Sequence, residues 1–82
     1  MASNLFIQAN IVEINDGPVY HVLLSSVPHV GELVELRSQK EERMGQEPYH
    51  KYRVIQIIHN VWDVPEDTDT GYQKVNIYVE QA

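Results

Sequence analysis

The chain has 82 residues, a formal net charge of −6 and no cysteine. This length predicts one domain, 1–82, and the lack of cysteine excludes disulfides, thiolate catalysis and thiolate zinc sites. The acidic balance opposes generic nucleic-acid binding, which needs a basic face. The N-terminus has no basic leader pattern and no apolar run reaches the roughly 18 residues of a membrane span, so we expect a cytoplasmic protein.

The first predicted strand spans 4–14, where apolar residues recur at every second position. A turn is predicted at 15–18, Asn-Asp-Gly-Pro, because Gly tolerates positive φ and the Asn and Asp side chains bond to nearby backbone. A second strand over 19–25 then completes a hairpin. The first strand is apolar on both faces, and an uncovered apolar face favours association, so we expect a homo-oligomer.

A corner is predicted next, at 27–32. Pro28 lacks the N–H that a central strand needs, and Gly31 permits the change of direction. A short third strand follows over 33–37. The polar segment 38–48 predicts a loop, with one helical turn at 39–44 where the residues are good helix formers.

The longest predicted strand covers 49–62. Its apolar positions change parity at Val54-Ile55, which predicts a bulge or bend, as a long strand in a small barrel requires. An acidic loop over 63–71 and a fifth strand over 72–80 complete the chain. Five strands with short connections predict an all-β fold: a small five-stranded antiparallel barrel, SH3-like or OB-like, or a curled meander.

Two motifs carry a resemblance to known proteins. Residues 27–34 read VPHVGELV and residues 52–59 read YRVIQIIH. The chain resembles small uncharacterised proteins of bacteria and their phages that have a VPxVG[DE]xV element and a later YxVxx[IV]xH strand. The resemblance covers residues 27–80. It implies a small β-barrel and a mobile-element setting, and it transfers no activity and no functional residue.

Catalytic and metal-binding patterns are weak. Ser25 and Ser26 lie outside any nucleophile elbow, and the chain has no glycine-rich phosphate loop, so we expect a protein that is not an enzyme. The acidic loop holds only a fragment of a calcium-binding pattern, and the histidines lack the short spacing of a zinc site, so no metal or cofactor is predicted. A single His beside a carboxylate of another strand stays open as an alternative. The four histidines are His21, His29, His50 and His59.

The predicted recognition site is the long strand together with the acidic loop. Arg53, His59 and Trp62 are the strongest candidates, because Arg forks onto carboxylates, His changes charge near neutral pH and Trp offers a large flat surface. Strict alternation puts Tyr49, Lys51 and Arg53 on one face, in line with His59. A purely structural role for Trp62 stays open. The full set of predicted ligand- or partner-binding residues is Tyr49, Lys51, Arg53, His59, Trp62, Asp63, Glu66, Asp67 and Asp69.

These patterns lead to one main hypothesis and two alternatives. The main one is a non-enzymatic phage or mobile-element accessory protein that presents its acidic loops to a basic surface of a host protein and inhibits it. It would then act in the host cytoplasm. The first alternative is a small-molecule-binding oligomer that holds its ligand with Tyr, Arg and His side chains. The second is a structural component of a larger assembly. A protein partner is expected, and neither a membrane nor nucleic acid.

Overall fold

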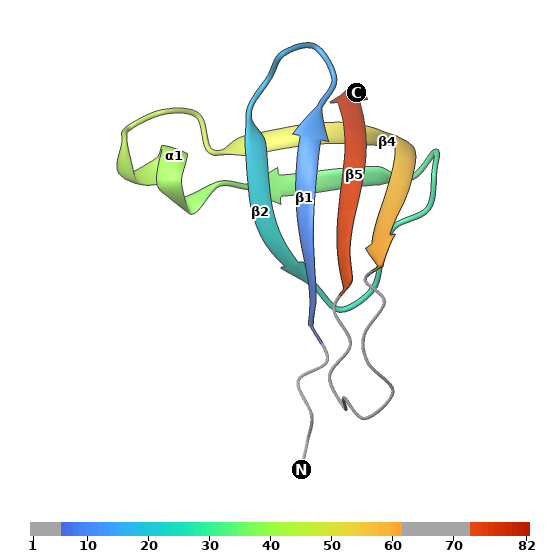
Figure 1. Cartoon of the computed structure of the whole chain (residues 1–82). Coiled ribbons are helices and arrows are strands. Elements are labelled where there is room, and N and C mark those ends of the chain that lie inside the picture. Colours follow the sequence, from blue (N-terminus) through green and yellow to red (C-terminus); the bar gives the residue numbers. More distant parts are fainter. Residues whose placement is uncertain (1–5, 62–72) are drawn as a thin grey trace.

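The computed structural model describes residues 6–61 and 73–82. They form one curled five-stranded sheet, a half-barrel, with almost no helix (Figure 1). This confirms the predicted all-β fold. The ends of the predicted strands at 4–5, 62 and 72 lie outside the described residues. The elements are β1 (Ile7–Glu13), β2 (Val19–Leu24), β3 (Leu33–Arg37), α1 (Gln39–Arg43), β4 (Tyr49–Val61) and β5 (Gln73–Gln81).

The strand order is β2-β1-β5-β4-β3, and one pairing departs from the expected antiparallel arrangement. β1 and β5 run parallel, with Ala9 opposite Val75 and Ile11 opposite Ile77. The pairs β1–β2, β3–β4 and β4–β5 are antiparallel, as predicted. Alternating apolar residues fit a parallel and an antiparallel neighbour equally well, so the sequence pattern carries no information on this choice.

β4 bends at a register shift between Val54 and Gln56, which confirms the predicted bulge. Its first part pairs with β3, and we call Leu33–Arg37 together with residues 49–53 the β3–β4 ribbon. Its second part pairs with β5, and we call β2, β1, β5 and residues 56–61 of β4 the front sheet. In Figure 1 the ribbon passes behind β1 and β2 and carries α1 beyond the β2 edge. The bend therefore lets a single strand serve both layers of the half-barrel.

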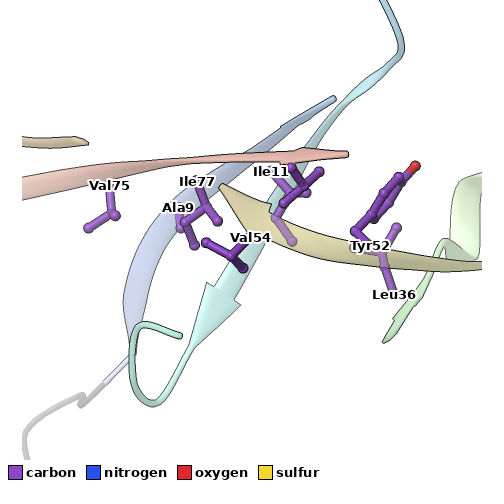
Figure 2. Packing of buried hydrophobic residues seen from close by; sticks show 8 residues of the cluster. Ala9, Ile11, Leu36, Tyr52, Val54, Val75 and Ile77 are labelled. Atoms are coloured by element: carbon purple, nitrogen blue, oxygen red, sulfur yellow. The ribbon is translucent and has the colours of Figure 1, made fainter. Parts of the chain in front are cut away.

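The core lies between the front sheet and the ribbon (Figure 2). The inward positions of β5 are fully buried, as the alternation predicted. Tyr52 and Leu36 enter the core from the ribbon at one end of the cluster. Each fully buried aliphatic side chain contributes about 1.5–3 kcal/mol. The buried cluster consists of Ala9, Ile11, Leu36, Tyr52, Val54, Val75, Ile77 and Val79.

The turns follow the predicted positions with one difference in mechanism. Gly31 has φ +94°, as the corner before β3 requires. In the β1–β2 turn, however, Asp16 takes the positive φ, at 59°. Gly17 is needed for close approach instead, because a Cβ atom there would lie 2.5 Å from the Glu13 Cδ atom.

The predicted helical turn is α1. The Ser38 hydroxyl accepts the Glu41 N–H over 3.2 Å and caps the helix N-terminus. Within residues 6–61 and 73–82, no helix is long and apolar enough to cross a membrane.

Candidate functional site: the outer face of the ribbon

The outer face of the β3–β4 ribbon gathers exposed cationic, aromatic and apolar side chains. Residues directly opposite one another in an antiparallel pair point to the same side of the sheet. Here the register sets Leu33 opposite Arg53, Glu35 opposite Lys51 and Arg37 opposite Tyr49. We call these six side chains the ribbon face. Its two largest apolar groups, Leu33 and Tyr49, are 52% and 63% exposed.

Arg37 is held in place by its neighbours. Its Nε and Nη2 atoms both donate to Glu42 Oε1, over 2.9 and 2.6 Å. Its guanidinium lies 5.8 Å from the centroid of the Tyr49 ring, within the range of a cation–π contact. The hydrogen bond with Glu42 raises the pKa of Arg37 above its already high ordinary value, so the group stays charged.

Lys51 and Arg53 are held only loosely. Lys51 Nζ lies 3.9 Å from Glu35 Oε1, and both side chains are more than half exposed. Arg53 Nη1 donates to the Gly31 carbonyl oxygen over 3.4 Å, at the long end of hydrogen-bond distances. Exposed pairs of this kind are worth about 0–1 kcal/mol. Both cationic groups can therefore turn toward a partner at little cost.

The charge of the chain is unevenly distributed around this face. Residues 33–53 hold five of the six Lys and Arg residues and four of the twelve Asp and Glu residues, a formal charge of +1. The rest of the chain, with one cation and eight acids, carries −7. The ribbon and its loop are thus the one segment of an acidic chain that suits an acidic partner surface.

The structure brings together three of the predicted site residues and separates a fourth. Tyr49, Lys51 and Arg53 share the ribbon face, as predicted. His59 does not lie in line with them: it is opposite Val75, on the side of the sheet that holds the core. The bulge after Val54 inverts the alternation, so the prediction from strict parity was wrong here. The remaining predicted residues, Trp62, Asp63, Glu66, Asp67 and Asp69, lie outside the described residues.

A second cluster, at the inner side of α1, links α1 to β2 and β4 through Glu41, and β4 to β1 through Tyr52. Tyr20 OH donates to Glu41 Oε2 over 3.0 Å, and His50 Nε2 lies 2.5 Å from Glu41 Oε1. The His50 ring is stacked on Tyr52, with centroids 5.9 Å apart and planes 11° apart. Tyr52 OH donates to Glu13 Oε2 over 3.0 Å. The cluster ties β2, α1, β4 and β1 to one another.

The electrostatics of this cluster suit a structural role. The hydrogen bond with His50 lowers the pKa of Glu41, so the carboxylate stays ionised. Burial, followed by the hydrogen bond with Glu13, strongly raises the pKa of Tyr52, so its hydroxyl stays protonated and keeps donating. Sequence reasoning missed Tyr20 and Glu41. The available signal was that Tyr20 and His50, whose aromatic rings carry polar atoms, occupy inward positions of otherwise apolar strands. Such a side chain needs a hydrogen-bond partner inside the fold.

A groove of about 620 Å³ runs beside this cluster, between β2 and the ribbon with α1. Residues 18–22 form one wall, and Leu36 to Glu41 form much of the other. Its size is that of small-molecule sites. Among residues 6–61 and 73–82, no three His, Asp or Glu side chains converge as metal ligands would.

Comparison with protein-family models, with curated proteins and with solved structures finds no significant match to this chain.

Proposed function

We propose that this protein is a non-enzymatic protein-binding domain whose ribbon face docks onto an acidic surface of another protein. The observation that supports this most is the gathering of Lys51, Arg53 and Tyr49 on one exposed face of a chain that is acidic elsewhere. Arg and Tyr are enriched at the energetic centres of protein interfaces, and complementary charge speeds association and selects the partner.

The face specifies the chemistry of the partner. Leu33 and Tyr49 are exposed apolar anchors at diagonal corners, with the cationic groups of Lys51 and Arg53 between and beside them. A matching surface has carboxylates around a small apolar patch. Arg53 can fork onto one of those carboxylates. As part of this proposal, the protein is a phage or mobile-element accessory protein and the partner is a host protein that it inhibits; the sequence resemblance supports the mobile-element setting alone.

The sequence predicts that the acidic residues face a basic surface of the partner, and in this proposal they form a second contact, with a basic part of the same partner. These residues are Asp63, Glu66, Asp67 and Asp69. The ribbon face and this acidic segment would then meet opposite charges on one partner, which favours a single orientation of docking.

The test compares charge reversals on and off the ribbon face. The double variant Lys51→Glu/Arg53→Glu reverses the two loosely held cations. Lys74→Glu is the matched control, because Lys74 is the one cation outside residues 33–53 and lies on β5 of the front sheet. Tagged wild-type and variant proteins are used to capture partners from a lysate of the host, and each captured protein is then titrated at two salt concentrations.

We expect the wild type and Lys74→Glu to bind the same protein, with affinity falling as salt rises. The double variant should lose at least about tenfold in affinity while its melting temperature is unchanged, since exposed substitutions shift stability by about 0.5 kcal/mol or less. Full affinity in the double variant, or equal loss in Lys74→Glu, would exclude the ribbon face as the docking site.

The groove beside β2 favours a second candidate, a small-molecule-binding protein. Its walls carry a hydroxyl at Tyr20, an imidazole at His21 and a cation at Lys40, next to apolar Leu36. Native mass spectrometry of the purified protein measures this directly. A bound compound of defined mass supports the second candidate, and the bare chain mass supports the first.

A further inference from the structure

The outer edge of β2 is open for strand pairing. β2 is an end strand of the sheet, and no described strand pairs with its outer side. Glu13 N donates to the Pro18 carbonyl, so residues 13 and 18 form a hydrogen-bonded pair of the β1–β2 ladder. Such pairs alternate with pairs whose backbone groups point away from the neighbour. The N–H and C=O groups of Val19, His21 and Leu23 therefore point outward, along the free edge.

The side chains along this edge offer nothing that prevents pairing. Natural edge strands are protected from association by charges, prolines or bulges. Residues 17–31 contain no Asp, Glu, Lys or Arg, and this is the longest uncharged stretch of the chain. Val19 and Leu23 are 50% and 63% exposed. The β2 edge is thus an uncharged, largely apolar strand edge whose outward backbone groups have no partner among residues 6–61 and 73–82.

The pattern of apolar residues in β2 is the same in both directions about His21. With a two-fold axis at His21, Val19 of one copy lies opposite Leu23 of the other, and Tyr20 lies opposite Val22. The outward-pointing groups of Val19, His21 and Leu23 then meet one another, which gives about six hydrogen bonds. Apolar residues face apolar residues in all pairs but the central one, where His21 faces His21, and the paired segment holds no Asp, Glu, Lys or Arg.

Charge favours a second copy over other partners at this edge. Two chains of −6 repel one another over most of their surfaces. They can approach where charge is absent, and all of β2 lies within that stretch. In Figure 1 α1 lies beyond the β2 edge, and residues 18–22 form one wall of the groove between them, so the β2 strand of a second copy would lie along this groove.

From these observations we infer that the protein forms a two-fold dimer in which the β2 strands of two copies pair antiparallel and join the two sheets into one. This surface is separate from the ribbon face, so the dimer presents two partner-binding faces. It places the association on β2 rather than on β1, where Val12 is half-buried between its register neighbours Val19 and Tyr78 and the exposed Phe6 and Ile14 flank opposite ends of the strand.

The first test uses crosslinking, for which the cysteine-free chain is well suited. His21→Cys places one thiol on each side of the proposed axis, with Cα atoms about 5.5 Å apart, a distance that a disulfide spans. Glu35→Cys is the matched control, at the centre of the other end strand, β3. Under mild oxidation at about 0.1 mM protein, His21→Cys should form a covalent dimer nearly completely, and Glu35→Cys should remain largely uncrosslinked.

The second test removes the dimer. Light scattering at the same concentration should give the wild type a mass twice the 9.5 kDa of one chain. Leu23→Lys should halve that mass, while Leu33→Lys, an exposed leucine on β3, leaves it unchanged. A monomeric wild type overturns the inference, as does a dimer that Leu33→Lys dissolves or that His21→Cys fails to crosslink. A peptide or small molecule found on the β2 edge of a monomer overturns it equally.

Discussion

The two end strands of the sheet, β2 and β3, have the same backbone geometry and opposite side-chain chemistry. In β3, Ser38 N donates to the Pro48 carbonyl, so the outward-pointing backbone groups belong to Leu33, Glu35 and Arg37. In β2 they belong to Val19, His21 and Leu23. One edge thus carries an acid and a base at two of three positions, and the other carries no charge.

The two edges therefore differ in whether their side chains prevent pairing with another strand. A strand edge with exposed backbone groups pairs with any suitable strand unless side chains prevent it. Glu35 and Arg37 protect the β3 edge and also serve the ribbon face that we propose for partner binding. β2 lacks such protection, and its open edge is the one we assign to the second copy. Four changes to the protein test or refine this comparison.

The largest expected effect comes from Tyr52, which links β4, the neighbour of β3, to β1, the neighbour of β2. Its ring is 1% exposed, and its hydroxyl reaches Glu13 of β1 from the ribbon. Tyr52→Ala should lower the free energy of unfolding by about 3–5 kcal/mol, because it removes a large core side chain. Urea denaturation measures this. Tyr52→Phe keeps the ring and should cost only about 1–3 kcal/mol, from the carboxylate left without its donor; an equal cost for both would show that packing is not the cause.

The next largest effect is expected at Gly17. A Cβ atom there would lie 2.7 Å from the Glu13 Cβ atom, so Gly17→Ala must displace Glu13 and its hydrogen bond with Tyr52. We expect a loss of about 1–3 kcal/mol of unfolding free energy by urea denaturation. A double-mutant cycle checks the mechanism, since the cost should shrink in a Tyr52→Phe background. If the costs of Gly17→Ala and Tyr52→Phe simply add, Gly17→Ala acts through strain in the turn and not through the Glu13–Tyr52 hydrogen bond.

A smaller effect is expected from pH at Glu41, which links α1 to β2 and β4. The hydrogen bond with His50 lowers the pKa of Glu41 below its ordinary value of 4.5. A carboxyl with a lower pKa in the folded chain stabilises the fold above its unfolded pKa, and this stabilisation is lost as the pH falls through the folded pKa. Thermal unfolding between roughly pH 6 and pH 3 should therefore show a smaller decrease of melting temperature for Glu41→Gln than for the wild type. Parallel pH profiles would exclude this role of Glu41.

The smallest effect on folding is expected from the double variant Glu35→Val/Arg37→Val. Both side chains are exposed, so stability should change by about 1 kcal/mol or less. Association should change instead, because the β3 edge without its charges can also pair with a strand of another copy. Light scattering should then detect species larger than those of the wild type. An unchanged mass would mean that something other than these charges keeps β3 from pairing.

Much of the local structure could be predicted from the sequence. The alternation of apolar residues in β5, the turn at 15–18, the corner at Gly31, the helical turn and the bulge near Val54 all depend on neighbouring residues, and all are present in the structure. The sequence also placed Tyr49, Lys51 and Arg53 on one face, because no irregularity separates them.

Which distant segments meet could not be predicted from these local patterns, because it depends on long-range packing. The parallel pairing of β1 with β5 joins residues more than sixty positions apart, and alternation is the same for either direction. Likewise, the side of the sheet on which His59 lies depends on the exact residue at which the bulge occurs. The contact between His50 and Glu41 depends on how the segment between β3 and β4 folds back onto β4. The sequence shows that β3 carries charged residues and that β2 carries none. The strand order that places both strands at the edges of the sheet arises from long-range packing of the core.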